Sequence, residues 1–90
     1  MILKTYTVTL AVANQVEILV LPVKGDTDVS ITCGFGMATV EIGTRENAEA
    51  AAWAALPAVG EYDKKLADGE ALYVRANIAP VRVPVVLGRS

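Results

Sequence analysis

The sequence predicts an all-β fold, an antiparallel β-sandwich of about seven strands with an immunoglobulin-like or jelly-roll-like arrangement. Short segments in which apolar and polar residues alternate recur along the chain, and Gly, Asn, Asp and Pro separate them. Apolar residues make up 53% of the chain and charged residues 20%, a composition typical of a folded protein. Because 90 residues bury only one modest core, we expect a single domain over residues 1–90.

The first two strands are expected at residues 5–10 and 16–23. In the first, Tyr6, Val8 and Leu10 share one face while threonines share the other, which is the pattern of a half-buried strand. In the second, alternation almost disappears because nearly every position is apolar. We therefore expect this second strand to be covered on both faces.

Two further strands are expected at residues 29–33 and 38–42, with a Gly-rich reversal between them. Their inward rows are Val29, Ile31 and Cys33, and then Ala38, Val40 and Ile42. The following stretch is ambiguous. Thr44 resembles a helix cap before an Ala-rich run, yet only Trp53 and Leu56 are bulky enough to anchor a helix. The sequence thus predicts either a short helix near 45–55 or an irregular crossover.

The last three strands are expected at residues 61–66, 72–76 and 81–87. Asp68-Gly69 supplies a tight turn between the first two of them. Their inward rows are Tyr62, Lys64 and Leu66, then Leu72, Val74 and Ala76, then Val81, Val83, Val85 and Leu87. Since Pro84 has no N–H to donate, the last strand should lie at a sheet edge or leave that position unpaired.

Composition excludes several classes of function. The net charge of −2 gives no basic surface for a nucleic-acid backbone, so no nucleic-acid partner is expected. With no His and one Cys, the chain lacks the residues of a zinc site or of a Cys/His nucleophile. We expect no enzymatic activity, no cofactor and no metal.

Carboxylates provide the remaining chemistry. Glu61, Asp63, Asp68 and Glu70 flank a hairpin turn, where charges are ordinarily solvated rather than catalytic. Asp26 and Asp28 resemble a fragment of a calcium loop, although an Asx-rich turn explains them without a metal. A small enzyme or metal-binding domain that uses Asp26 and Asp28 is kept as a third hypothesis.

The first residues lack the charged and apolar regions of a signal peptide, and the stretch 18–23 is too short to cross a bilayer. No membrane association is expected. Apolar residues nevertheless exceed what seven short strands can hide, which indicates either self-association or scattered exposed side chains. The Tyr73–Arg75 pair is typical both of interface anchors and of cross-strand packing. The candidate interface residues are Ile18, Val20, Tyr73, Arg75, Arg82, Pro84 and Val86.

About two thirds of the chain, residues 29–87, carries a family resemblance. Val29-Ser30-Ile31-Thr32 opens into a Gly turn, Ala38–Gly43 forms a valine-rich strand, and Leu66–Ala76 followed by Val81-Arg82-Val83 ends the chain. This order resembles the small β-sandwich accessory proteins of tailed-bacteriophage virions, which include decoration, head-fibre and tail-associated proteins. The Ala-rich run departs from that family, whose members have a plain loop there.

The resemblance implies a homo-oligomer on the virion surface. Because the first residues do not form a signal peptide, we expect synthesis in the host cytoplasm. Our leading hypothesis is a non-enzymatic virion structural protein, a capsid decoration or cement protein or a head- or tail-associated module. It would bind capsid or tail proteins through apolar strand faces, with a trimer favoured. The alternative is a carbohydrate-binding module, for which Trp53 and Tyr73 would form the exposed aromatic platform.

Overall fold

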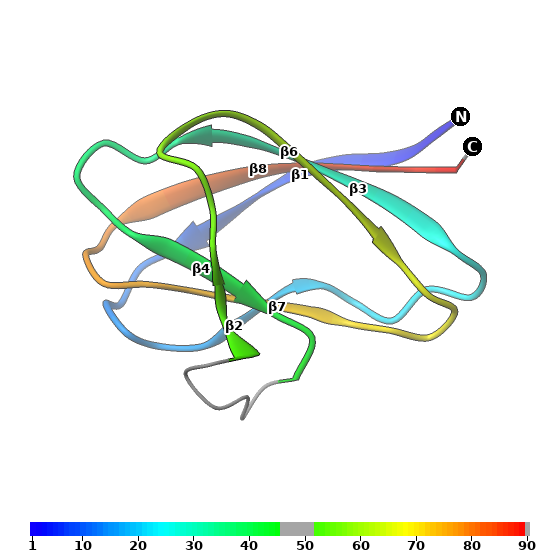
Figure 1. Cartoon of the computed structure of the whole chain (residues 1–90), viewed down its shortest axis with the longest axis horizontal. Helices are drawn as coiled ribbons and strands as arrows, with labels where there is room; N and C mark the ends of the chain where they lie inside the picture. The colour runs from blue at the N-terminus through cyan, green and yellow to red at the C-terminus, as the bar shows by residue number, and fades with distance from the viewer. Residues whose placement is uncertain (46–51, 90) are drawn as a thin grey trace.

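The computed structural model describes residues 1–45 and 52–89, and it confirms an all-β sandwich of two antiparallel sheets (Figure 1). Sheet A has the strand order β1-β8-β3-β6 and sheet B the order β2-β7-β4-β5. The strands are β1 (Ile2–Leu10), β2 (Glu17–Val20), β3 (Thr27–Gly34), β4 (Val40–Gly43), β5 (Ala54–Ala55), β6 (Val59–Leu66), β7 (Leu72–Ala76) and β8 (Val81–Gly88).

The inward rows that alternation predicts form the core between the sheets. The rows of β7 and β8 are buried throughout, as are Val29, Ile31 and Cys33 of β3. Tyr6, Val8 and Tyr62 are partly buried and pack against this core, so the predicted inward faces of β1 and β6 are confirmed. Period-two alternation therefore positions most of the core.

The second strand differs from its prediction. Only residues 17–20 form a strand, and this strand, β2, lies at the edge of sheet B. Its two faces are not both covered. A register shift between Ile18 and Val20 lets Leu19 and Val20 both enter the core, while Ile18 stays exposed. Such a bulge places consecutive apolar residues on one side, which explains the lost alternation without a second covering layer.

The crossover between β4 and β6 is the second difference. The expected helix near 45–55 falls largely on residues 46–51, which lie outside the described residues. Past them, Ala54–Ala55 form the short β5, which pairs with Glu41 and Ile42 of β4. No helix in the described part of the chain is long and apolar enough to cross a membrane.

Pro84 lies in an inner strand, so an edge position for β8 was wrong. On one side Pro84 is opposite Thr7 of β1, whereas the ladder between β8 and β3 begins only at Val85. Pro84 therefore has a partner strand on one side alone, in agreement with the other half of the expectation. This arrangement accommodates a residue that cannot donate to a ladder.

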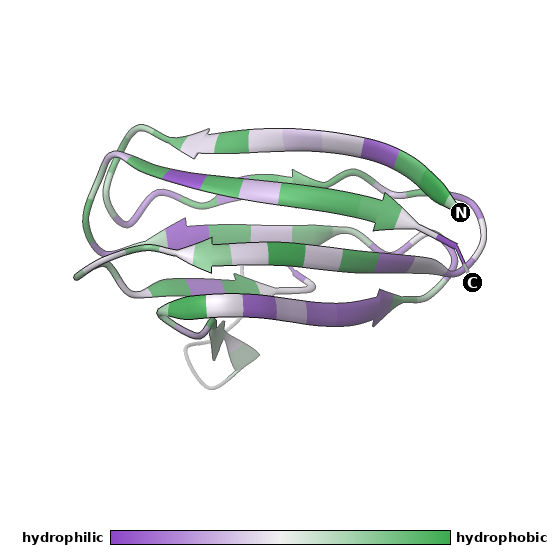
Figure 2. Cartoon of the chain, turned by 90° about the horizontal axis from the view of Figure 1, so that it is seen from above, coloured by the Kyte–Doolittle hydropathy of each residue, from purple (hydrophilic) through white to green (hydrophobic). Residues whose placement is uncertain are grey.

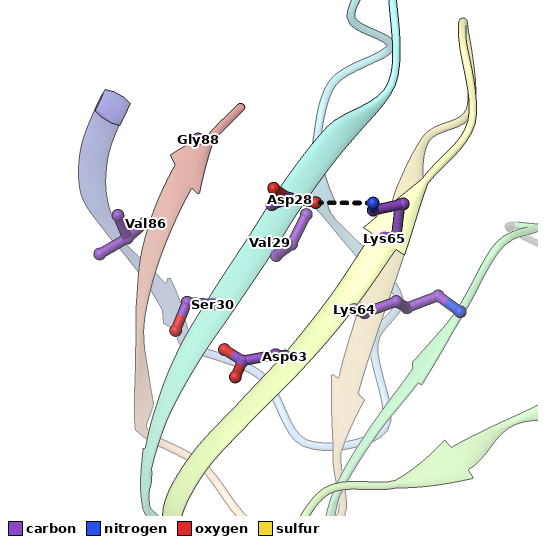
Figure 3. Close-up of a pocket in the computed structure, with 8 residues that line it drawn as sticks. All are labelled: Asp28, Val29, Ser30, Asp63, Lys64, Lys65, Val86 and Gly88. Carbon is purple, nitrogen blue, oxygen red and sulfur yellow. Dashed lines mark ion pairs between the residues drawn. The ribbon is translucent and has the colours of Figure 1, made fainter. Parts of the chain in front are cut away.

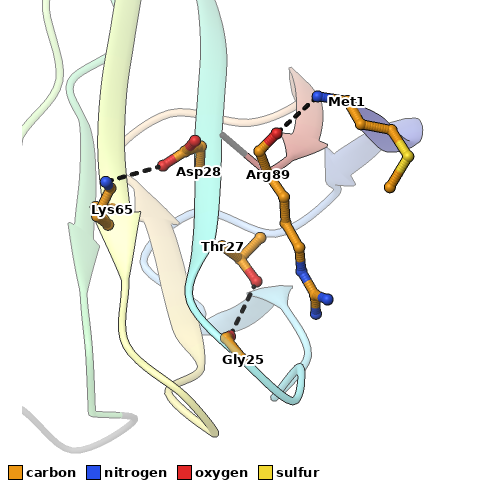
Figure 4. A network of polar contacts seen from close by, with 6 residues as sticks. All are labelled: Met1, Gly25, Thr27, Asp28, Lys65 and Arg89. Atoms are coloured by element: carbon orange, nitrogen blue, oxygen red, sulfur yellow. Dashed lines mark hydrogen bonds and ion pairs between the residues drawn. The ribbon is translucent and has the colours of Figure 1, made fainter.

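One end of the sandwich carries polar contacts that join the two ends of the chain to the β2–β3 connection (Figure 4). The Met1 amino group donates to the Arg89 carbonyl at 2.6 Å, and the Arg89 N–H donates to the Met1 carbonyl at 2.8 Å. The Arg89 guanidinium also donates to the Lys24 carbonyl. The Gly25 N–H donates to Asp68, which ties this connection to the β6–β7 turn.

Candidate functional site

The structure separates the predicted interface residues into four places. Tyr73 and Arg75 lie half-buried on the outer face of sheet B, whereas Arg82, Pro84 and Val86 lie on the outer face of sheet A. Ile18 is at the edge of sheet B, with 39% of its surface exposed. Val20 is fully buried in the core, so it offers no surface to a partner. The predicted residues therefore do not form one patch.

On the outer face of sheet B, a small cluster surrounds Trp53. The Arg75 guanidinium lies 4.4 Å from the centroid of the indole ring, and its Nε donates to Glu41 Oε1 at 3.2 Å. Gly43 leaves room for the indole, because a Cβ there would lie 3.3 Å from the ring. Trp53 is only 7% exposed. The Arg75 side chain thus packs across the sheet surface. Of the two interpretations of the Tyr73–Arg75 pair, this contact favours cross-strand packing over an interface anchor.

Burial of Trp53 bears on the carbohydrate-binding alternative. That hypothesis needs two exposed and roughly coplanar rings, and Trp53 presents almost no free face. An indole exposed beside Tyr73 was therefore a wrong expectation. The indole packs against Gly43 and Arg75, outside the main core. The alternation of apolar and polar residues does not predict this contact.

The outer face of sheet A has a shallow depression of about 450 Å³ (Figure 3). Its floor includes Ser30 of β3 and Val86 of β8, which are ladder partners. Asp28 of β3 forms an ion pair with Lys65 of β6, with 3.8 Å between Asp28 Oδ1 and Lys65 Nζ. Asp63 lies two residues before Lys65 in β6. The depression therefore combines apolar and charged side chains, and one of its two carboxylates already has a cation beside it.

The other carboxylates have structural partners or stand apart. Asp68 accepts from the Gly25 N–H, and Glu70 accepts from the Ala67 N–H at 3.5 Å. Asp26 is exposed in the β2–β3 connection. Across residues 1–45 and 52–89, no group of three or more His, Cys, Asp or Glu side chains is arranged to hold a metal. Burial raises the pKa of the Cys33 thiol, which opposes formation of the thiolate.

An apolar groove of about 320 Å³ runs between β1 and β2, where one edge of each sheet meets the other. We call this side of the sandwich the open edge. Its lining residues come from β1, the β2 region and β8: Lys4, Tyr6, Val8, Ile18, Leu19, Leu21, Val23 and Leu87. Of these, the sequence singled out only Ile18. The largely apolar run at 18–23 was the signal for Leu19, Leu21 and Val23.

Tyr6 joins the two sheets at the open edge. Its hydroxyl donates to the Leu19 carbonyl at 2.5 Å, and Lys4 Nζ lies 5.2 Å from the centroid of its ring. Partial burial raises the pKa of the Tyr6 hydroxyl above its usual value. The hydroxyl lies at the core boundary and holds the two edge strands at a fixed separation.

We predict that Tyr6→Phe lowers the free energy of unfolding by about 1 kcal/mol at neutral pH, because the Leu19 carbonyl loses its donor. Since the folded-state pKa is raised, the contribution of Tyr6 is fully present below about pH 10 and is lost as pH rises through the folded pKa. Urea titrations of both proteins across this range measure the difference. Tyr62→Phe is the control, and a difference independent of pH would contradict the assignment.

No family model matches the chain, and no curated protein and no solved structure is significantly similar to it.

Proposed function

We propose that this protein is a non-enzymatic structural accessory of a tailed-bacteriophage particle, and that it assembles into a homo-oligomer through the open edge. The observation that carries the proposal is a difference between the two edge strands of sheet A. One edge is protected against pairing by charges, and the other is nearly free of them.

The contrast between the two edges is visible in Figure 2. β6 has four charged residues, Glu61, Asp63, Lys64 and Lys65, which discourage pairing with another strand. β1 is nine residues long and has a single charge, Lys4. A long edge strand with little charge favours association with another chain. β1 is therefore the edge of sheet A that is suited to a contact.

The apolar groove beside β1 also favours this side of the molecule as the contact surface. Ile18 and Leu21 are exposed at its rim, and Tyr6 and Val8 are only partly covered. An apolar strip next to an unprotected strand favours a protein contact over free exposure to water. In the trimer that we favour, the open edges of three copies face a common axis, so Ile18 of each copy is buried by its neighbours.

The phage setting rests on the resemblance in residues 29–87, which implies that the oligomer sits on the virion surface and contacts capsid or tail proteins. The mixed surface of the outer sheet faces also fits a binding protein better than an enzyme. In the described residues the carboxylates are dispersed or partnered rather than gathered in a deep cavity.

We predict that the purified protein has about three times the 9.5 kDa mass of one chain, and that Ile18→Lys reduces the mass to that of one chain. A charge in the contact would have to be buried without a partner. Multi-angle light scattering gives the mass. Ile78→Lys is the matched control, because Ile78 is also exposed but lies away from the open edge.

A monomeric wild-type protein would contradict the oligomer, and a dimer would contradict the three-fold arrangement. Mass spectrometry of purified phage particles tests the setting directly. The protein should be found in stoichiometric amounts with the capsid or tail proteins, and its absence from all such particles would contradict the virion role.

A further inference from the structure

Four loops gather at the end of the sandwich that lies opposite the two chain ends (Figure 1). They are residues 11–16, 35–39, 56–58 and 77–80, and we call this surface the loop end. None of these residues is charged. The opposite end is different, because its connections contain Lys24, Asp26, Asp68 and Glu70, and Arg89 follows β8 there.

The loop end exposes large apolar side chains. Met37 is 93% exposed, Ile78 is 47% exposed, and Val12 and Val59 beside them are also exposed. The loop that carries Met37 turns its aromatic residue inward, because Phe35 is buried in the core. Exposed apolar side chains on uncharged loops mark a contact surface when they occur together rather than singly.

Hydrogen bonds hold these loops together. Asn77 N–H donates to the Thr39 carbonyl at 3.2 Å, and Thr39 N–H donates to the Asn77 side chain at 2.7 Å. Phe35 N–H donates to the Ala58 carbonyl at 3.1 Å, and Asn14 N–H donates to the Ala76 carbonyl at 2.7 Å. The surface is therefore formed in advance, and binding through it requires little ordering of the loops.

Size and charge indicate what covers the loop end. The two shorter dimensions of the molecule are 25 and 19 Å, so a flat partner would cover roughly 500 Å², below the about 800 Å² per partner of a standard interface. End-to-end contact between two copies is therefore too small. Without Lys or Arg the loops lack the charge that attracts anionic lipid, and their one aromatic ring is buried.

We propose that the loop end inserts into an apolar, uncharged recess of a protein of the phage particle, which surrounds the loops and so buries more area than a flat contact. This inference rests on the proposed function and adds a second surface to it. The open edge joins copies of the chain, and the loop end attaches the oligomer to the particle. Met37 and Ile78 are the residues that enter the recess.

The test uses phage particles that contain the protein, stripped of it by mild denaturant and reloaded with purified variants. Met37→Lys and Ile78→Lys are each expected to reduce the amount that co-sediments by roughly tenfold or more at limiting concentration, because each buries an unpaired charge. Ala67→Lys adds the same charge at the opposite end, in an exposed turn, and should bind like the wild type. Light scattering and circular dichroism check that all variants keep the fold and the oligomer.

The outcomes separate the two proposals. If the wild type reloads and both loop-end variants reload equally well, the loop end is not the attachment surface, while the virion role stands. If particles never contain or reload the wild type, both proposals are wrong. Equal loss in Ala67→Lys would also overturn the inference, and so would wild-type binding to phosphatidylcholine vesicles, which would identify a lipid surface.

Discussion

Ile31→Ala is expected to lower the free energy of unfolding by about 3 to 4 kcal/mol, a large part of the roughly 5–10 kcal/mol that stabilises a domain of this size. Ile31 is fully buried in β3, where its ladder partners are Tyr62 of β6 and Val85 of β8. Neighbouring strands on both sides prevent collapse of the backbone into the cavity. Urea titration followed by Trp53 fluorescence and circular dichroism measures the change.

Thr32→Ala is the control for Ile31→Ala, because Thr32 is the next residue of the same strand and is exposed on the outer face of sheet A. Its loss should stay below about 1 kcal/mol, the range of β-propensity effects. Equal losses at the two positions would show that the side chain of Ile31 is not in the core, and would contradict the register of β3.

Trp53→Ala has the second largest expected effect, a loss of about 2 to 3 kcal/mol. Removal of a Trp from a full core costs about 3–5 kcal/mol, and the smaller figure reflects the place of Trp53 outside the main cluster. The variant loses the packing on Gly43 and the contact with the Arg75 guanidinium. Far-ultraviolet circular dichroism follows the urea unfolding, since the variant has no Trp.

Trp53→Phe tests how much of the stability lost in Trp53→Ala a smaller aromatic ring restores. Phenylalanine keeps a face for Arg75 and most of the apolar surface, so at least half of the lost stability should return. The crossover that contains Trp53 would then be anchored by its ring. An unchanged free energy of unfolding in Trp53→Ala would contradict this role, because removal of a nearly buried indole must lower stability.

The sequence was sufficient for the fold wherever a strand has one covered face. In β7 and β8, buried residues alternate with more exposed ones at every position, and each residue lies on the expected side of its sheet. The turn at Asp68-Gly69 was also predictable, because Gly69 has a φ of 74° that few other residues tolerate. These features depend on residues close together in sequence.

The remaining features depend on contacts between distant residues. The bulge in β2 changes which side Leu19 and Val20 face, and no local pattern shows it. Trp53 is buried because Gly43 of β4 makes room for it and Arg75 of β7 covers it. The loop end is likewise invisible in the sequence, since its four uncharged loops come together only through the topology of the two sheets.

The pairing of the first strand with the last affects the order in which the protein matures. β1 has β8 as its ladder partner in sheet A, although the two lie at opposite ends of the described chain. During translation β1 is made before β8, so it lacks its ladder partner until β8 has been synthesised. The nascent chain thus keeps a nine-residue strand with a single charge, Lys4, without its ladder partner while β2 to β7 are made, and release of β8 from the ribosome sets the moment at which sheet A closes.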